Sequence, residues 1–420
     1  MKRILYELKA QPLIAAVTVV GTALAIFLIM VVVMMQQVKV DPFGPEPHRN
    51  RTIYADRLNE VRLNGVGWTR SSIGIRGVHE IFDSIPGIER ISVFSKYIQD
   101  APVGIKGQPM KKTKVIATDD NYWKIFAHNF LAGHPYDSVQ CAAGEKLAVV
   151  SKSVASRFWA SPDDAIDKEI MVNRIPRKIV GVVDDVTPLA TNAYSQVWTP
   201  MKTSYTTKSV MRGSEKAAIL IESPEQLPAI RDRVSQRIAT INSRIADEGI
   251  ELDLMGAPFS HEEYALGINF GDLPDLEGHK KRQLIIYIIL LIVPAVNLAG
   301  MTQSRLRRRT GEIGVRRAFG ATRASIFVDL LVENFIVTLA AGIVGLVFSL
   351  MFAYLFGPLV FADNANMSSD SVVSIGALFH WSTFGLVLLF CFVLNILSTG
   401  IPALRASRVN PVNALNGHQK

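Results

Sequence analysis

Residues 305–323, RLRRRTGEIGVRRAFGATR, contain seven arginines and one glutamate and lie between two long apolar runs. Charged side chains are costly to bury in the hydrocarbon of a bilayer. Arginine and lysine in short loops are retained on the cytoplasmic side of a membrane. The stretch therefore predicts a membrane protein and marks the cytoplasmic face of the membrane.

Four apolar runs are long enough, or nearly so, to cross a bilayer, because a spanning helix needs about 20 residues. These runs are Leu13 to Met35, Leu284 to Met301, Phe335 to Phe356 and Trp381 to Ala403. The second run is the shortest and contains Pro294 and Asn297. A membrane helix tolerates both residue types when neighbouring groups satisfy the polar atoms. We therefore expect four transmembrane helices.

The first run could instead be a signal peptide, because Lys2, Arg3 and Lys9 give it a basic flank. The apolar core of a signal peptide has about 7 to 15 residues and ends at a small-residue cleavage site. The run from Leu13 to Met35 is longer and continues into MMQQVKV. An uncleaved membrane anchor is the interpretation that we adopt.

Charge in the short segments predicts the orientation. Residues 1–12 have a net charge of +2, residues 305–323 of +6 and residues 404–420 of +3, whereas residues 357–380 contain no lysine or arginine. The rule that short positive loops stay inside places both termini and the 305–323 loop in the cytoplasm. The 357–380 loop and residues 36–283 then lie outside.

This orientation divides the chain into three parts. Residues 1–35 form the cytoplasmic N-terminus and the first helix, residues 36–283 an extracytoplasmic domain, and residues 284–420 the other three helices with their loops and the C-terminus. Three basic residues, 280–282, oppose this orientation at the outer end of the second run. They are outnumbered by the seven arginines at the other end of the same run.

The net charge of +8 flanks the membrane segments instead of covering a soluble face. Anionic lipid headgroups are the partner that such a distribution favours, and we expect no nucleic-acid partner. Cys141 falls in the extracytoplasmic domain and Cys391 inside the fourth apolar run. These two cysteines cannot pair with each other, so no disulfide framework is expected.

The extracytoplasmic part predicts an α+β domain. Gln226 to Asp247 predicts an amphipathic helix, since Ile230, Val234, Ile238, Ile241 and Ile245 recur at helical spacing. Ser151 to Trp159 predicts a shorter helix that begins at a serine. Five stretches rich in valine and isoleucine predict strands. They are ERISVFSKY, MKKTKVIATDD, KLAVVSKSVASRF, EIMVNRIPRKIVGVVDDV and KAAILIES.

We find no catalytic or metal-binding pattern in this domain. Its histidines show no HxxxH or HExxH spacing, and it has no GxSxG motif. Asp184 and Asp185 follow a predicted strand and are typical of a turn. The domain is therefore expected to bind or to move, not to catalyse a reaction, and we expect no bound metal.

Two motifs in the C-terminal part resemble the FtsX-like permease domain of ABC transporters. The first is RRRTGEIGVRRAFGATRASIFVDLLVENFIVTLAAGIVGLVFS and the second is PALRASRVNPVNALN. The extracytoplasmic domain is similar to the periplasmic core domain of MacB-type permeases over VIATDDNYWKIFAHNFLAGHPY and the stretch KLAVVSKSVASRFWASPDDAIDKEIMVNRIPRKIVGVVDDV. It departs from that family at His134, where arginine is usual, at Trp159 and Ala160, where Phe-Gly is usual, and at Asp167, where glycine is usual.

The resemblance implies a non-catalytic permease of the bacterial inner membrane that dimerises with itself or with a paralogue. It implies that a separate cytoplasmic ATPase drives motion of the outer domain, for export or extraction of an envelope substrate. The alternative is a regulatory subunit that controls an envelope enzyme such as a peptidoglycan hydrolase. A periplasmic or outer-membrane partner is also compatible with the family. The chain has no GxxxxGK[ST] motif, so we expect ATP and Mg²⁺ on the ATPase and no cofactor on this chain.

The resemblance also suggests where the ATPase would dock. The first cytoplasmic loop of the family holds a coupling helix, and EIGVRRAFGA can form one that ends at Gly320. The expected coupling residues are Glu312, Ile313, Val315, Arg316, Arg317, Phe319 and Gly320. A local helix pair between Glu312 and Arg316 is the simpler alternative. Five further arginines are expected at the membrane surface or on the ATPase: Arg305, Arg307, Arg308, Arg309 and Arg323.

Polar and small residues mark the third apolar run. Asp329 and Glu333 share one helical face. Glu333 lies ten residues after Arg323, so it is either within the inner leaflet, where a carboxylate is costly, or solvated at the interface. Ala341, Gly342 and Gly345 permit close approach of a second helix. That second helix belongs either to the partner subunit of a dimer or to the same chain.

Overall fold

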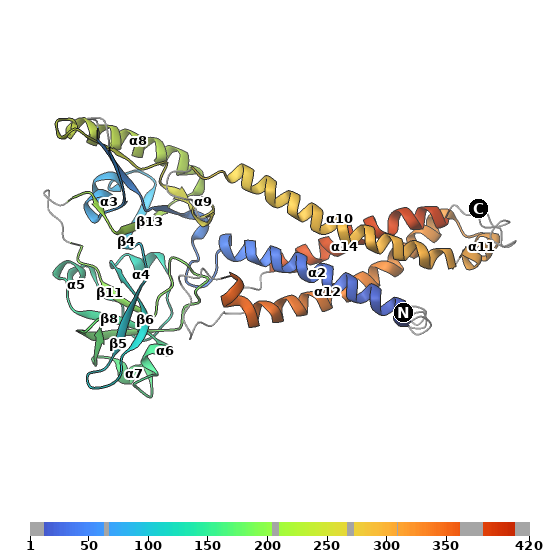
Figure 1. Cartoon of the computed structure of the whole chain (residues 1–420), viewed down its shortest axis with the longest axis horizontal. Coiled ribbons are helices and arrows are strands. Elements are labelled where there is room, and N and C mark those ends of the chain that lie inside the picture. The colour runs from blue at the N-terminus through green and yellow to red at the C-terminus, as the bar shows by residue number, and fades with distance from the viewer. Residues whose placement is uncertain are drawn as a thin grey trace. The chain divides into compact units, whose positions relative to one another are not determined.

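The computed structural model describes residues 12–62, 67–203, 210–266, 273–308, 310–361 and 381–407. The chain divides into two compact units, whose elements are labelled in Figure 1. The first unit takes in the chain as far as Gln37 and the helices that follow Leu276. The second unit begins at Val38 and is built mainly from the residues up to Leu276.

The first unit is helical. Its described helices are α2 (Pro12–Val40, whose last residues belong to the second unit), α10 (Leu276–Arg308), α11 (Thr310–Ala318), α12 (Arg323–Phe361) and α14 (Trp381–Ser407). Within the described residues, three stretches are long and apolar enough to cross a membrane: Val19–Val40, Arg323–Phe356 and Gly385–Arg405. They overlap the first, third and fourth predicted runs.

The second predicted run, Leu284 to Met301, is helical within α10. The side chains of residues 293, 294, 297 and 298 lie outside those that the structure describes, and the count of four membrane helices stays a prediction. Large apolar side chains such as Ile285, Ile289 and Ile292 are nevertheless exposed along α10. Exposed apolar faces of this kind suit contact with lipid.

Helices α12 and α14 are joined by a buried polar side chain. Asn395 Nδ2 donates a hydrogen bond to the carbonyl oxygen of Leu331 at 3.1 Å, and Thr399 Oγ1 bonds Asn395 Oδ1 at 3.3 Å. Phe335 and Phe392 make an edge-to-face contact with ring centroids 6.2 Å apart. Because lipid supplies no hydrogen-bond partner, a buried amide must be satisfied by a neighbouring helix. Asn395 therefore sets how these two helices pack.

The second unit is an α+β domain. Its described strands are β1 (Thr52–Ala55), β2 (Leu58–Arg62), β3 (Trp68–Ile73), β4 (Ile88–Ser95), β5 (Gln99–Gly104), β6 (Lys111–Thr118), β7 (Phe130–Gly133), β8 (Leu147–Ser151), β9 (Glu169–Val172), β10 (Ile175–Val183), β11 (Val197–Pro200), β12 (Arg212–Gly213), β13 (Glu215–Ile221), β14 (Ile250–Asp253) and β15 (Phe259–Ser260). Its described helices are α3 (Ile75–Phe82), α4 (Tyr122–Ile125), α5 (Ser138–Ala143), α6 (Lys152–Ala155), α7 (Pro162–Ala165), α8 (Leu227–Arg244) and α9 (His261–Ala265), with short 3-10 helices η1 (Arg49–Arg51), η2 (Pro224–Gln226) and η3 (Ala246–Glu248).

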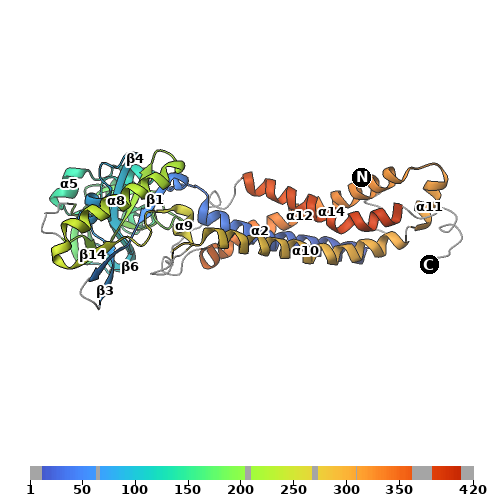
Figure 2. The ribbon, with the colours of Figure 1, turned by 90° about the horizontal axis from the view of Figure 1, so that it is seen from above.

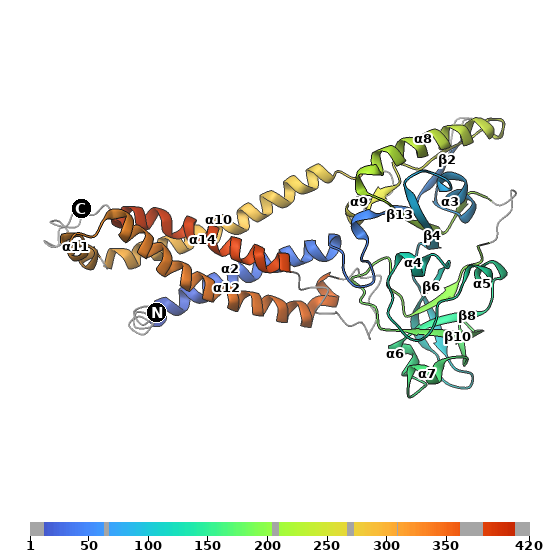
Figure 3. The same ribbon diagram turned by 180° about the vertical axis from the view of Figure 1, so that it is seen from behind.

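The strands run in the order β11-β8-β10-β9-β5-β6-β4-β13-β3-β2-β14, mostly antiparallel. The upper half of the domain, in the view of Figure 1, packs α3 and α8 on β1, β4 and β13 around residues such as Val78, Ile219 and Ile230. The lower half has its own core between α6 and the strands β8 and β10, around residues such as Val150, Val154 and Val182. The two halves meet where Phe94 of β4 pairs with Thr118 of β6. Figure 3 shows the same two halves from behind.

The strand predictions are confirmed to within one residue, since the five stretches coincide with β4, β6, β8, the pair β9 and β10, and β13. The amphipathic helix is confirmed as α8, with Ile230, Val234 and Ile241 buried. The second predicted helix is too long: α6 ends at Ala155, and turns follow. Ser151 caps it as expected, because its hydroxyl accepts a hydrogen bond from the Val154 amide.

His261 is buried in this domain and His128 is half-buried, and neither imidazole has an anionic group at hydrogen-bond distance among the described residues. His128 lies within ring contact of Trp123 and Trp198, and His261 lies beside Tyr54. Burial lowers the pKa of each imidazole from its ordinary value of 6.5 to about 4. Both side chains are therefore neutral at neutral pH.

These shifts predict loss of stability on acidification. Below pH 6.5 the unfolded chain binds a proton at each histidine, whereas the folded domain binds it only near pH 4. As the pH falls through that window, each histidine thus lowers the free energy of unfolding by about 1.4 kcal/mol per pH unit. Burial raises the pKa of Asp119 to about 7, which acts in the opposite sense. Because the wild-type slope contains both contributions, the histidine contribution is measured by comparing variants with the wild type.

We expect His261→Gln to make the free energy of unfolding less dependent on pH between 6.5 and 4. The slope should decrease by about 1.4 kcal/mol per pH unit, which corresponds to one proton. Tryptophan fluorescence during denaturant unfolding of the detergent-solubilised chain measures this slope at several pH values. The control is His134→Gln, because His134 is exposed. An unchanged slope in the His261 variant would contradict the assignment.

Candidate functional site

Helix α11 and the link that follows it form the main candidate site, and the sequence predicted this segment as the coupling helix. Gly320 ends α11 in the left-handed region with φ +94°. The amide of Gly320 donates to the carbonyl of Arg317 at 3.1 Å, and that of Ala321 to the carbonyl of Arg316 at 3.0 Å. These two bonds make up a Schellman motif, which requires a residue with positive φ at this position.

The next helix begins at once. Thr322 Oγ1 accepts a hydrogen bond from the amide of Ser325 at 3.1 Å, so Thr322 is the N-cap of α12. The link from residue 319 to residue 322 is therefore held at both ends by hydrogen bonds. The turn between α11 and α12 has a defined geometry, in which Phe319 is the first residue of the link.

The apolar residues of α11 face in two directions. Ile313 is 5% exposed and packs in a cluster with residues from α10, α12 and α14, namely Leu306, Ile326, Leu330 and Ala403. Val315 is 42% exposed and Phe319 is 90% exposed. Residues four apart lie on one face of a helix, so Val315 and Phe319 form one outward apolar surface. Ile313 instead anchors α11 to the three long helices.

Charged residues join α11 to α12. Arg316 Nη2 lies 3.3 Å from Glu312 Oε1, and Arg316 Nη1 lies 3.7 Å from Asp329 Oδ2. All three side chains are partly exposed, so each contact contributes about 0 to 1 kcal/mol. The sequence placed Asp329 among the membrane residues, whereas the structure brings it beside the two coupling candidates. The three groups orient α11 against the first turns of α12.

The other predicted residues of this segment are placed as follows. Arg317 and Glu333 are half-buried, and Arg323 is exposed. The side chains of Arg305, Arg307 and Arg308 lie outside those that the structure describes, and so does the whole of Arg309. The outer loop was predicted to begin at residue 357, but α12 continues to Phe361, and residues 362–380 lie outside the described residues. Figure 2 shows α11 at the end of α10 and at the beginning of α12.

The small residues of α12 contact helices of the same chain. A Cβ atom on Gly342 would lie 2.6 Å from Cys391 Sγ of α14, and a Cβ atom on Gly345 would lie 2.7 Å from the Ala23 carbonyl oxygen of α2. Ala341 beside them is fully buried. These residues therefore allow α2, α12 and α14 to approach closely.

We predict that Gly345→Ala destabilises the helical unit by about 1 to 3 kcal/mol, because the added methyl group overlaps the backbone of α2. The matched control is Gly385→Ala in α14, where the added Cβ would meet no described atom within 4 Å outside the adjacent backbone of its own helix. That change is expected to be neutral or to stabilise by up to about 1 kcal/mol, since alanine favours helix. Thermal unfolding in detergent measures both, and equal effects would contradict the packing.

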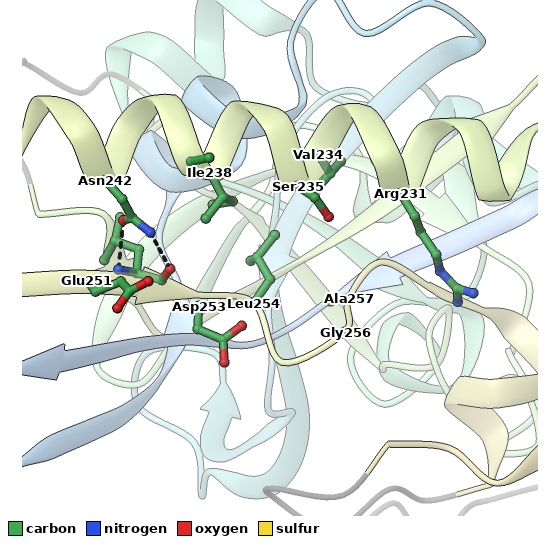
Figure 4. Close-up of a pocket in the computed structure, with 12 residues that line it drawn as sticks. Arg231, Val234, Ser235, Ile238, Asn242, Glu251, Asp253, Leu254, Gly256 and Ala257 are labelled. Carbon is green, nitrogen blue, oxygen red and sulfur yellow. Dashed lines mark hydrogen bonds between the residues drawn. The ribbon is translucent and has the colours of Figure 1, made fainter.

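A groove with a volume of about 570 Å³ lies between α8 and β14 in the α+β domain (Figure 4). Asn242 of α8 crosses it: Nδ2 donates to the Leu252 carbonyl at 3.0 Å, and the Leu252 amide donates to Oδ1 at 2.8 Å. Arg231, Glu251 and Asp253 also line the groove. Among the described residues, no group of three or more His, Cys, Asp or Glu is arranged to hold a metal ion.

Comparisons with known proteins agree with the sequence motifs. Residues 13–237 match the family of MacB-like periplasmic core domains, and residues 284–411 match the FtsX-like permease C-terminal family. The ABC transporter permease YknZ of Bacillus subtilis is 22% identical over 302 residues, which cover 71% of this chain and 68% of YknZ. The macrolide export ATP-binding/permease protein MacB of Hahella chejuensis is 24% identical over 304 residues, 71% of this chain and 42% of MacB.

The chain thus spans about two fifths of the length of the MacB relatives that it matches. Among solved structures, the periplasmic region of MacB from Actinobacillus actinomycetemcomitans aligns with 47% of this chain and 88% of its own length. Its sequence identity is 11% and its TM-score is 0.33.

Proposed function

This chain belongs to the ABC transporter permeases that combine a MacB-like periplasmic core domain with an FtsX-like permease domain, and we propose that it passes the motion of a separate cytoplasmic ATPase to its periplasmic domain. Membership of this family implies a cytoplasmic ATPase partner and a place in the inner membrane. The observation that supports the proposal is the outward surface formed by Val315 of α11 and Phe319 of the link that follows it.

Docking at this surface explains an aromatic side chain that is 90% exposed beside a helix anchored on its other face. Large aromatic residues at such positions are frequent anchors of protein interfaces. The anchor also explains transmission. Ile313 packs with residues of α10, α12 and α14, so displacement of α11 moves the adjoining ends of three long helices together.

In this proposal the partner ATPase, and not the permease, binds the nucleotide. The 420 residues contain no GxxxxGK[ST] motif that could hold nucleotide phosphates, so in this proposal ATP and Mg²⁺ are bound by the ATPase. The permease works as a dimer, with a second copy or with a paralogue. Export or extraction of an envelope substrate is the activity that we favour, because the MacB relatives are named for macrolide export.

The proposal predicts that Phe319→Ala weakens association with the ATPase by about tenfold or more, because an interface loses its aromatic anchor. The matched control is Phe356→Ala, since Phe356 is also exposed but lies far along α12 from the link. Copurification of the tagged permease with its ATPase from membranes measures both. Equal recovery of ATPase with the two variants would contradict a role of Phe319 in the interface.

Charge reversal at Glu312 or Arg316 tests the polar part of the same surface. Either reversal is expected to abolish ATPase association while membrane insertion stays intact. The exchanged double variant, Glu312→Arg with Arg316→Glu, restores a local pair of opposite charges but reverses its direction. Recovery of ATPase association in the double variant would assign the effect to the local ion pair and not to contact of either side chain with the ATPase.

A further prediction concerns the side of the membrane. Four membrane helices with both termini in the cytoplasm place the α+β domain outside, as the charges of the short segments indicate. Protease added to intact spheroplasts should therefore cut the α+β domain and spare the 305–323 segment. Opening the membranes should expose that segment. Cleavage of the α+β domain only after opening would overturn the orientation.

A further inference from the structure

The last turn of α2 is capped by buried side chains that lie in the same compact unit as residues 38–276. Arg49 Nη1 donates to the carbonyl of Val38 at 2.7 Å and to that of Asp41 at 3.0 Å. His261 Nε2 lies 2.9 Å from the Lys39 carbonyl, which can only accept a hydrogen bond. The last carbonyls of a helix lack partners in their own helix and carry partial negative charge. Arg49 supplies donors and positive charge at that end.

The same guanidinium joins two further segments. Arg49 Nε donates to Glu46 Oε2 at 2.6 Å, and Arg49 Nη2 donates to the Leu189 carbonyl at 3.1 Å. Arg49 also lies over the ring of Phe43, 4.2 Å from its centroid. A guanidinium is planar, so donors in this fixed fork hold their acceptors at defined positions. Three parts of the chain therefore meet at one side chain.

Glu46 extends the connection into both halves of the domain. Its Oε1 accepts hydrogen bonds from the amides of Asn192 at 2.8 Å and Ala193 at 3.0 Å. Asn192 Oδ1 in turn accepts from Lys216 Nζ at 2.8 Å. Lys216 lies in β13, a central strand of the upper half, and the 189–193 segment leads into β11 of the lower half. A continuous path of polar contacts thus runs from the end of α2 to both halves.

This path is dry. Arg49, Glu46 and Asn192 are each 2% exposed, and Lys216 is 6% exposed. Burial by itself raises the pKa of the Glu46 carboxyl, but Arg49, His261 and the Asn192 amide outweigh it, and the net pKa is lowered. Glu46 therefore stays ionised at neutral pH. Hydrogen bonds between ionised groups are short and strong, and solvent does not screen them here.

We propose that Arg49 and Glu46 form the mechanical joint through which displacement of α2 reaches both halves of the periplasmic domain. This inference rests on the proposed function, because it supplies the path by which motion that begins at α11 would leave the helical unit. Arg49 and Glu46 are positioning residues: they contact neither nucleotide nor cargo. Their role is to make the end of α2 move as one body with the 189–193 segment and β13.

Arg51 offers a matched control two residues away. It pairs with Glu89 at 2.6 Å, but both side chains are partly exposed, and Arg51 Nη1 also donates to the Ile221 carbonyl at 3.3 Å. No bond between Arg51 and the end of α2 is seen in the described residues. An ion pair at the surface contributes little stability, because water and salt screen the attraction between its charges. Replacing Arg51 removes the same charge from the same segment without opening the joint.

The experiment is amide hydrogen exchange, read by mass spectrometry, on the full-length permease with the ATPase that copurifies with it, in the presence and absence of ATP and Mg²⁺. In the wild type and in Arg51→Met, ATP is expected to change exchange both at α11–α12 and within the periplasmic domain. In Arg49→Met, the change at α11–α12 is expected to persist and the change in the periplasmic domain to be lost.

Exchange without ATP shows whether the variant is folded, since only the surroundings of the Asn192 and Ala193 amides should differ from the wild type. If Arg49→Met unfolds the domain, Arg49→Lys is the variant to use. It keeps the positive charge but lacks the planar guanidinium, so the ATP-dependent change in exchange within the periplasmic domain should become smaller. A folded Arg49 variant with a full ATP response in the periplasmic domain would overturn the joint. A wild type without any ATP response would overturn the proposed function, and the joint with it.

Discussion

Lipid offers no hydrogen-bond partner to a peptide group, and this constraint shapes the helical unit. It requires backbone bonds to close within each helix, which accounts for the uninterrupted lengths of α2, α12 and α14. It also limits how helices recognise one another, because apolar side chains gain little by leaving lipid. Recognition therefore falls to close contact at Gly342 and Gly345 and to the amide of Asn395, which bonds a neighbouring backbone.

Much of the fold could be predicted from local pattern. The apolar runs, the stripe of α8 and the valine-rich strands are signals within a short window, and the structure has helices or strands there. Strand β5 was not predicted, because QDAPVG contains Pro102 and Gly104 and shows no alternation. It is a strand because β6 and β9 pair with it on both sides. Such a strand is imposed by its neighbours, which lie elsewhere in the sequence.

The candidate site was predicted as a segment but not in its detail. Ile313, Val315 and Phe319 were grouped by their apolar character, yet two residues along a helix correspond to a rotation of about 200°. Ile313 therefore faces inward while the other two face outward. Arg49 and Glu46 were not predicted at all. They stand in the proline-rich stretch DPFGPEPHRNR, and their partners Leu189 and Asn192 lie 140 and 146 positions away, so no local pattern contains them.

The sheet of the periplasmic domain ends at β14, and an unpaired terminal strand is a template for a strand from another molecule. Asn242 fills the position that such a strand would take, since its side-chain amide reproduces both bonds of a paired residue at Leu252. The helix α8 thereby shields the ladder with one of its own side groups. At Leu252, this edge of the sheet therefore has no free backbone amide or carbonyl to offer a strand from another molecule.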